Sequence, residues 1–310
     1  MAYYTADEMN DVLNQKPQYR SKLYCRGFLI TTNDSLELNS YPFYGLWKKT
    51  QLNDKYFAYI HPDTNISLIE SGKVTHFLIG HAYNPFSMEY QEKEILKNLD
   101  LKLKENKNAY WDYQSELTGV FCMGIVKDDK IMFETDCTGM QLVFYGTNER
   151  NMYITSHAKM VADICGFNQT KYIQKLINSK FYRYWGTFLP GDISPYQELT
   201  RVQPNFEYIY DISQQSFEFK RFFPNKKIGI VNEEEVEKTF EEISEIMKKN
   251  LCLISKKWPD KAAISVTGGR DSTATLASAK PVYDKLKYFS YQSQESESVD
   301  AKAAHKICEK

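Results

Sequence analysis

The spacing of apolar residues changes near residue 225, and the change divides the chain into two parts. Before it, short runs of apolar and aromatic residues alternate with polar turns, which is typical of antiparallel sheets. Two stretches that interrupt this pattern, at 92–103 and 159–164, predict helices. Two runs that alternate with a period of two, at 206–210 and 217–222, predict a hairpin. The other expected strands are residues 26–32, 56–60, 75–79, 119–126, 130–134, 142–145 and 152–155.

After residue 225 the pattern is one of alternating helices and strands. Asn232, followed three residues later by Glu235, predicts the capped start of a helix whose apolar face continues to Leu251. Such alternation predicts a parallel sheet that binds its ligands at the carboxyl ends of the strands. The elements expected after this helix are strands at 262–266 and 286–291 and a last helix at 299–307.

The sequence Thr-Gly-Gly-Arg-Asp-Ser (267–272) joins the first of these strands to a helix of small residues. Two adjacent glycines let the backbone approach a ligand closely, and a helix N-terminus directs N–H donors at an anion. A carboxylate at Asp271 would repel phosphate unless a divalent ion such as Mg²⁺ bridges the two. The segment therefore predicts a magnesium–phosphate site. A tight turn without a ligand, in which Asp271 caps the helix, is the alternative.

The composition narrows the classes of protein that the chain can represent. With 310 residues, of which 42% are hydrophobic and 15% aromatic, it has material for two domains and is not globally disordered. A net charge of −1 gives no electrostatic footprint for nucleic acid, and no apolar run approaches the ~20 residues of a membrane-spanning helix. The start carries no secretory signal, so the cytoplasm is the expected location. Six scattered cysteines without a Cys-x-x-Cys argue against a metal site built from Cys and His.

With this loop, the helix before it and the β-rich part upstream, the chain resembles the asparagine synthetase family. The loop is similar to the PP-loop of those enzymes, Ser-Gly-Gly-x-Asp-Ser, with Thr267 in place of the first serine. Three upstream stretches resemble family motifs in the same order: Leu-Thr-Gly-Val-Phe-Cys-Met-Gly-Ile (117–125), Asp-Cys-Thr-Gly-Met-Gln-Leu-Val-Phe-Tyr (136–145) and Tyr-Ile-Thr-Ser-His-Ala-Lys (153–159). The resemblance covers residues 25–310.

The resemblance implies an α+β domain followed by an α/β domain. Residues 1–224 would form an Ntn-type αββα sandwich of the class II glutamine amidotransferase kind. Residues 225–310 would form the N-terminal portion of a parallel-sheet PP-loop domain, similar to the adenine nucleotide α hydrolases. Because the family's second phosphate motif and its catalytic lysine lie further downstream, we expect the chain to be truncated at its C-terminus, with the synthetase's catalytic residues beyond residue 310.

The resemblance also implies that the chain binds ATP and Mg²⁺. Asp271 would be the metal ligand, and the backbone at Ser265 and Tyr291 would meet the adenine, with sheet packing as the alternative for Tyr291. Asp300 is expected to cap the last helix, and the role of Arg270 stays open. The complete set of expected nucleotide-binding residues is Ser265, Thr267, Gly268, Gly269, Asp271, Ser272 and Tyr291.

The amidotransferase part departs from the family at three places. The family's nucleophile is a cysteine directly after the initiator Met, where this chain has Ala2. Cys25 could serve only if residues 1–24 were removed, and the alternative is an ordinary thiol on the first strand. Ile79 stands where the family has an asparagine that donates to the oxyanion. A His-Arg-Gly glutamine-binding motif is missing from the sequence. The glutaminase half is therefore expected to be inactive.

These features predict an ATP-dependent carboxylate–amine ligase that releases AMP and pyrophosphate and makes an amide through an acyl-adenylate. Its partners would be a small carboxylate and an amine or ammonia, without nucleic acid or membrane, and a homodimer is a further option. One alternative is a β-lactam-synthetase-like or other biosynthetic amide-forming ligase of a peptide or polysaccharide pathway. The other is a non-catalytic interaction protein.

Overall fold

The computed structural model describes residues 4–149, 151–184, 186, 188–224, 232–291 and 298–309. The chain forms two compact units. The first contains residues 1–81, 96–111 and 119–225, and the second contains residues 82–95, 112–118 and 226–310. Ala2 and the stretch 225–231, where the sequence predicts the domain boundary, lie outside the described residues.

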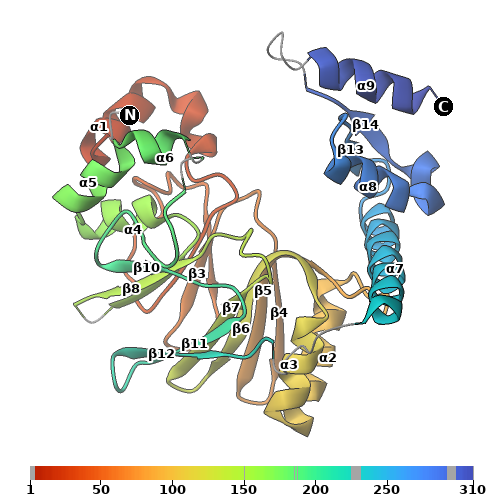
Figure 1. Cartoon of the computed structure of the whole chain (residues 1–310). Coiled ribbons are helices and arrows are strands. Elements are labelled where there is room, and N and C mark those ends of the chain that lie inside the picture. The colour runs from red at the N-terminus through yellow and green to blue at the C-terminus, as the bar shows by residue number, and fades with distance from the viewer. Residues whose placement is uncertain are drawn as a thin grey trace. The chain divides into compact units, whose positions relative to one another are not determined.

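Two six-stranded sheets with antiparallel pairing dominate the first unit (Figure 1). The order of the first sheet is β10-β8-β9-β1-β3-β2, and that of the second is β12-β11-β7-β6-β5-β4. The first is built from β1 (Phe28–Thr31), β2 (Lys48–Gln51), β3 (Phe57–Ile60), β8 (Phe144–Asn148), β9 (Asn151–Thr155) and β10 (Leu199–Arg201). The second is built from β4 (Ile66–Ser71), β5 (Val74–Tyr83), β6 (Thr118–Lys127), β7 (Lys130–Thr135), β11 (Phe206–Asp211) and β12 (Ser216–Arg221).

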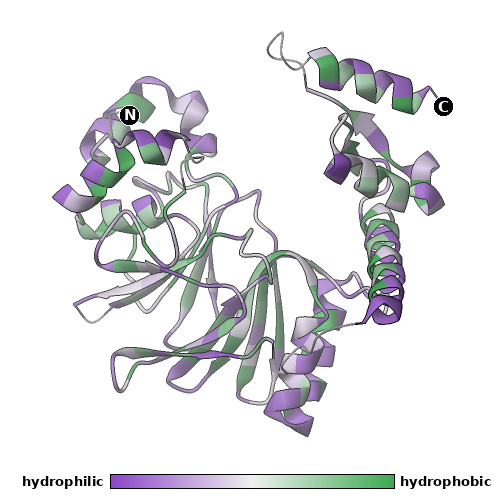
Figure 2. Cartoon of the chain, viewed as in Figure 1, coloured by the Kyte–Doolittle hydropathy of each residue, from purple (hydrophilic) through white to green (hydrophobic). Residues whose placement is uncertain are grey.

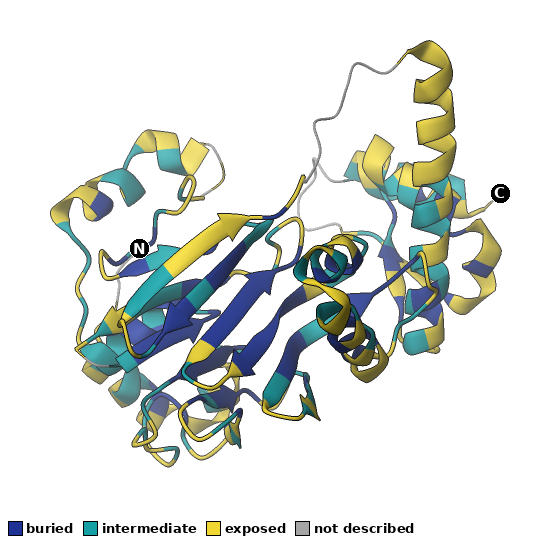
Figure 3. Cartoon of the chain, turned by 90° about the horizontal axis from the view of Figure 1, so that it is seen from below, coloured by how far each residue is buried: buried dark blue, intermediate teal, exposed yellow. Residues whose placement is uncertain are grey.

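The main core lies between the two sheets. Alternate residues such as Phe28 and Ile30 of β1 pack in one cluster with Phe77 of β5 and Phe133 of β7, and all four are fully buried. Successive side chains of a strand point to opposite faces, so Leu29 packs on the other side of the first sheet. The hydrophobic residues accordingly form bands along the strands in Figure 2. In Figure 3 the buried residues lie largely on strands, whereas the edge strands β2 and β12 are mostly exposed.

Helices cover the outer face of each sheet. Leu29 packs in a second cluster with the buried face of α4 (Ala158–Cys165). On the other sheet, α2 (Glu92–Glu105) is followed by α3 (Lys107–Ser115), from which the Tyr110 hydroxyl donates to Glu134 Oε1 of β7 at 2.8 Å. The layers therefore follow the order helix, sheet, sheet, helix. The mixed α/β fold with antiparallel sheets is confirmed, and the predicted helices at 92–103 and 159–164 and the hairpin of β11 and β12 are present.

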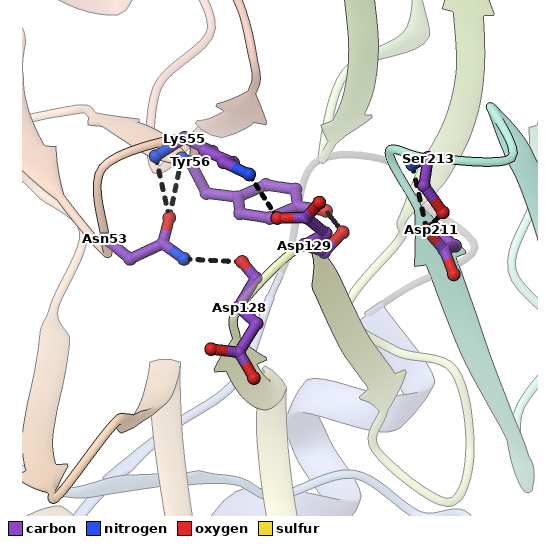
Figure 4. A network of polar contacts seen from close by, with 7 residues as sticks. All are labelled: Asn53, Lys55, Tyr56, Asp128, Asp129, Asp211 and Ser213. Carbon is purple, nitrogen blue, oxygen red and sulfur yellow. Dashed lines mark hydrogen bonds and ion pairs between the residues drawn. The ribbon is translucent and has the colours of Figure 1, made fainter.

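A polar network fixes the two sheets to each other at one end (Figure 4). The Asn53 amide of the turn between β2 and β3 donates to Asp128 O at 3.0 Å, and the Tyr56 hydroxyl donates to Asp129 O at 2.8 Å. Lys55 forms an ion pair with Asp129. Because Asp128 and Asp129 form the turn between β6 and β7, these contacts set the positions of turns from different sheets.

Several helical segments of the first unit were not expected from the sequence. Among them is α1 (Ala6–Gln15), whose start is a capping box in which Thr5 and Glu8 exchange hydrogen bonds. η1 (Pro17–Lys22), α5 (Lys171–Ile177) and α6 (Lys180–Tyr184) were not expected either, nor was α3. α1 and η1 come before β1, and α5 and α6 come after α4. The residues before Cys25, to which the resemblance does not extend, are therefore folded where the structure describes them.

The second unit begins with the long helix α7 (Glu233–Lys257). Its predicted start is confirmed, since Asn232 and Glu235 form a capping box, but the helix extends beyond Leu251 because the next turn buries Leu253. The pairing of the two short strands that follow is parallel, with Ile264 beside Tyr288. The later elements are β13 (Ala263–Ser265), α8 (Arg270–Ser278), η2 (Lys280–Lys285), β14 (Lys287–Phe289) and α9 (Ser298–Cys308).

The C-terminal end of α7 is fixed by polar contacts within the second unit. Lys257 forms an ion pair with Glu92, and these side chains are only 10% and 9% exposed. The Trp258 indole donates to the Tyr83 hydroxyl at 2.9 Å. Because both partners come from residues 82–95, these contacts explain why that segment belongs to this unit. None of the helices that the structure describes is both long enough and apolar enough to cross a membrane.

Candidate functional site

The predicted phosphate loop is a strand–loop–helix connection in the second unit. The chain leaves β13 at Ser265 and enters α8 at Arg270, with Gly269 as the N-cap residue. Gly269 has no side chain to cap the helix, and the first N–H groups of a helix have no partner within it. The start of α8 therefore presents backbone donors and the positive end of the helix dipole at the end of the strand, which is the arrangement that favours an anion.

Two hydroxyl groups hold the loop in this shape. The Thr267 and Ser272 hydroxyls are 2.8 Å apart, and Ser272 Oγ also accepts from Thr267 N at 3.2 Å. Thr267 Oγ1 accepts from Gly269 N at 3.1 Å. In this conformation both hydroxyls bond to the loop itself, so their contribution is to fix the direction of the backbone.

Asp300 of α9 also bonds to the loop. Its Oδ1 accepts from Gly268 N at 3.2 Å, and a Cβ at Gly268 would lie 3.1 Å from the same oxygen. The glycine thus allows α9 to approach. The sequence predicts Asp300 as the cap of α9, whereas the structure places it as the third residue of that helix with its carboxylate on the loop. The expected role as the capping residue was wrong because a partner 32 residues away competes for the carboxylate.

Asp271 lies in the first turn of α8 with an exposed side chain. Since Gly269 is the N-cap residue, the alternative in which Asp271 caps the helix does not hold. Mg²⁺ takes oxygen ligands and is commonly held by one or two carboxylates together with phosphate oxygens and water. An exposed carboxylate beside the N-terminus of a helix fits that chemistry. Arg270 is also exposed and has no partner among the contacts of the described residues.

A cavity of about 400 Å³ opens beside the loop. Its volume is within the range of small-molecule sites. Lys287 N donates to Ala262 O and Val266 N donates to Phe289 O, so the intervening polar backbone groups of Ala263 and Ser265 point away from β14. The lining residues are Leu251, Ile254, Ala262, Ala263, Ile264, Ser265, Asp271, Ser272, Thr275 and Leu286.

Tyr291 is the one predicted nucleotide-binding residue that lies outside the segment 265–272. It follows β14 rather than belonging to it, because the strand ends at Phe289. Its ring is 69% exposed and meets the Phe289 ring edge to face, with the centroids 5.2 Å apart. Ser265, Thr267, Gly268, Gly269, Asp271 and Ser272 are adjacent in the structure, and their binding of nucleotide stays a prediction.

A second group of reactive side chains lies in the first unit. Cys25 belongs to a turn before β1 and not to the first strand as expected, because Tyr24 and Arg26 have positive φ angles. Its thiol donates to Asp63 Oδ2 at 3.6 Å. One sulfur, one nitrogen and one oxygen ligand atom of Cys25, His61 and Asp63 all lie within 4.8 Å of one another. His61 and Asp63 were not predicted from the sequence, since Asp63 is 38 residues from Cys25 and no spacing motif links them.

The His61 ring has a defined orientation in this group. Its Nδ1 accepts from Asp63 N at 3.0 Å, and its Nε2 faces Ser21 O at 3.1 Å. A carbonyl oxygen only accepts, so Nε2 carries the proton. The Trp47 ring meets the imidazole edge to face at 5.5 Å. Burial and the nearby His61 together lower the pKa of His157 to about 4, so His157 is neutral near pH 7.

Ile79 stands where the resemblance expects an asparagine that donates to an oxyanion, and its side chain has no donor. The Ile79 side chain is buried in the core between the sheets. Gly80 N donates to Asn65 O at 2.9 Å. The φ angle of Gly80 is +106°, and a Cβ there would collide with Val120 O, so the position requires glycine for the backbone alone. Neither the Ile79 side chain nor the bonded Gly80 amide therefore offers a donor to a tetrahedral oxyanion.

No protein-family model matches the chain, and no curated protein matches it. Among solved structures, it is similar to the allosteric regulatory enzyme of purine biosynthesis, with 12% identity and a TM-score of 0.39 over 96% of this chain and 68% of the other. It is also similar to glutamine phosphoribosylpyrophosphate amidotransferase from B. subtilis complexed with ADP and GMP. That match has 11% identity and a TM-score of 0.36, over 91% of this chain and 66% of the other. At these TM-scores the likeness identifies neither a family nor an activity.

Proposed function

We propose that the segment from Ala262 to Ser278 binds the phosphates of Mg·ATP and that the chain acts in ATP-dependent amide ligation of the asparagine synthetase type. The observation that carries this proposal is the loop itself. A strand runs into Thr-Gly-Gly, the helix that follows has a glycine as its N-cap residue, and an exposed Asp271 stands in the first turn. Donors for an anion and a ligand for its metal are thus adjacent.

Each predicted residue has a role in this proposal. Thr267 and Ser272 hold the loop, and the first N–H groups of α8 donate to the phosphates. The Gly268 and Gly269 amides donate as well once phosphate replaces their present acceptors, Asp300 and Thr267. Asp271 binds Mg²⁺. The adenosine would occupy the 400 Å³ cavity, where the backbone groups of Ser265 that point away from β14 can bond to the adenine, and Tyr291 would contact the base.

The proposed reaction transfers AMP from ATP to a small carboxylate and releases pyrophosphate. An amine or ammonia then attacks the acyl-adenylate, forming the amide and releasing AMP. Mg²⁺ supplies charge neutralisation to the pyrophosphate, while the loop amides orient it. The lack of a side-chain donor at Ile79, with the Gly80 amide already bonded to Asn65 O, favours an amine or ammonia from outside the sandwich over ammonia from glutamine. A ligase that closes an amide within one substrate is the second candidate, and the same observation favours it.

Binding of Mg·ATP to the 310-residue chain tests the proposal by calorimetry. Asp271→Asn should weaken the binding of Mg·ATP by at least about tenfold, because the metal loses its protein ligand. The same variant should bind metal-free ATP no more weakly than the wild type, because a repelling carboxylate is gone. Asp284→Asn, which removes an exposed acid from η2, is the matched control. Equal Mg·ATP affinity in the Asp271 variant and the wild type would refute the metal role.

A further inference from the structure

We propose that Cys25, His61 and Asp63 form a binding site for a divalent transition-metal ion such as Zn²⁺, independent of the nucleotide site. Thiolate, imidazole and carboxylate are the ligand types that zinc takes in proteins. Here two chain segments, one before β1 and one after β3, bring one of each to within 4.8 Å of the others. The sequence argues against such a site because its ligands are far apart along the chain.

The ligand atoms of the three residues must move slightly closer together to bind one ion. Bonds of ~2.0–2.3 Å in a tetrahedral site place neighbouring ligand atoms roughly 3.3–3.8 Å apart. The Cys25 thiol and the Asp63 carboxylate are already 3.6 Å apart. Asp63 is exposed and Cys25 is partly exposed, so both can adjust and an ion can reach them from solvent. His61 is buried and serves as the fixed ligand.

The hydrogen bonds of His61 are those of a metal-binding histidine. Such residues donate one ring N–H to a carbonyl or carboxylate, which fixes the tautomer and leaves the other nitrogen for the metal. In this protein Nε2–H donates to Ser21 O, and the lone pair of Nδ1 faces Asp63. The ion would replace the Asp63 N–H as the partner of Nδ1. Trp47 packs edge-on against the ring and limits its rotation.

The charges of the site match a divalent ion. Binding converts the Cys25 thiol to a thiolate and releases its proton to solvent. The thiolate and the carboxylate of Asp63 together carry two negative charges, which the ion neutralises, and the imidazole stays neutral. Three protein ligands leave a fourth position of the tetrahedron for water or a substrate group, as in zinc sites that are open to solvent.

The test uses the full chain after removal of metals with a chelator. Zn²⁺ affinity is measured by competition with a chromophoric chelator, and Co²⁺ is added in place of zinc because a cobalt–thiolate bond produces near-ultraviolet charge-transfer absorption. We expect one metal per chain and a cobalt–thiolate band. Cys25→Ser should abolish the band and weaken Zn²⁺ binding at least about 100-fold, and Asp63→Asn should weaken it at least about tenfold, since losing even a residue that only orients a ligand costs about 10- to 100-fold.

Cys137→Ser is the matched control, because Cys137 is an exposed cysteine elsewhere in the first unit. It should keep the band and the affinity of the wild type. Since His61 is buried, the two more exposed ligands are the ones changed, and circular dichroism verifies that both variants are folded. An unchanged band in Cys25→Ser, or no cobalt–thiolate band in the wild type, would overturn the proposal.

Discussion

The two units of this chain bury their apolar residues to different extents. In the first unit, two sheets supply large side chains such as Phe28, Phe77 and Phe133 to one core, and these are fully buried. The second unit has two strands of three residues each among its described elements. Its core consists largely of small and branched residues: Ala262, Ile264, Val266, Ala279, Val282, Leu286 and Ala304.

The same difference is visible along α7. Its apolar residues recur at helical spacing along its whole length, yet its first two turns are exposed, and Phe240 is 67% exposed. Only the C-terminal part, around Leu253, is buried. The spacing of apolar residues therefore predicts whether a segment is a helix or a strand. Whether those residues are buried depends on whether other elements of the unit pack against them. In the sandwich the period and the burial coincide because each sheet has a second sheet to face.

The largest expected effect comes from removing a buried ring from the core of the first unit, and it tests whether the two units unfold independently. Phe133→Ala should destabilise the sandwich by about 3–5 kcal/mol, because it leaves a cavity among the rings of Tyr145, Tyr208 and Phe217. Hydrogen exchange followed by mass spectrometry should show lost protection in β6, β7 and β11, with the peptides of α8 and β13 unchanged.

The control for this change is Phe219→Ala on β12, whose side chain is 62% exposed and should cost less than about 0.5 kcal/mol. Ile264→Ala is the converse test, because Ile264 belongs to the core of the second unit. It should lower the protection of α8 and β13 and leave that of β6, β7 and β11 unchanged. If either core substitution lowered protection equally in both units, the two cores would unfold as one and the contrast between them would fail.

How far the sequence predicts this molecule depends on the distance between the interacting residues. The strands around Phe28 and Phe133 were predicted because alternation within a strand is local. The start of α1 was missed although Thr5 and Glu8 carry a capping signal, because the resemblance began only at Cys25. The loop at 267–272 was predicted for the same local reason as the strands. The contacts of Asp300 with Gly268 and of Asp63 with Cys25 join residues 32 and 38 positions apart, and only the fold brings them together.

The next effect concerns a buried pair of acids in the sandwich. Glu134 and Glu207 lie on the adjacent strands β7 and β11 beneath α3, where Lys107 Nζ pairs with Glu207 Oε1 at 2.6 Å. Burial, reinforced by the charge of Glu207, raises the pKa of Glu134 to about 8. The native state therefore keeps a proton that the unfolded chain loses above its ordinary value of 4.5, so stability falls as the pH rises towards 8.

The window from about pH 7 to 8 isolates Glu134. Burial lowers the pKa values of His76 and His157 from 6.5, so above pH 7 they carry a residual charge only in the unfolded chain, which adds a small slope of the opposite sign that fades towards pH 8. Between pH 7 and 8 we expect a loss of about 1 kcal/mol in the free energy of unfolding, measured by urea denaturation. Glu134→Gln should remove this slope, while Glu218→Gln on the exposed strand β12 should keep it. A stability that rose over this window in the wild type would contradict a protonated Glu134.

The smallest expected effect concerns Asp300, and it tests whether this carboxylate competes with phosphate for the Gly268 amide. Asp300 places a carboxylate on Gly268 N, which is one of the amides that phosphate would need, so bound phosphate must displace it or approach its charge. Asp300→Asn should therefore strengthen the binding of metal-free pyrophosphate about fivefold, the effect of removing one like charge at roughly 4 Å in a solvated setting. Added salt should reduce the gain, because screening acts on the same interaction. Glu309→Gln removes an acid that lies just after the C-terminal end of α9 and pairs with His305 instead of the loop, and it should leave the affinity unchanged. Weaker pyrophosphate binding in Asp300→Asn would mean that the carboxylate orients the Gly268 amide for phosphate. Asp300 would then position the loop for its ligand instead of competing with it, and the second unit would have a preformed phosphate-binding loop despite its smaller core.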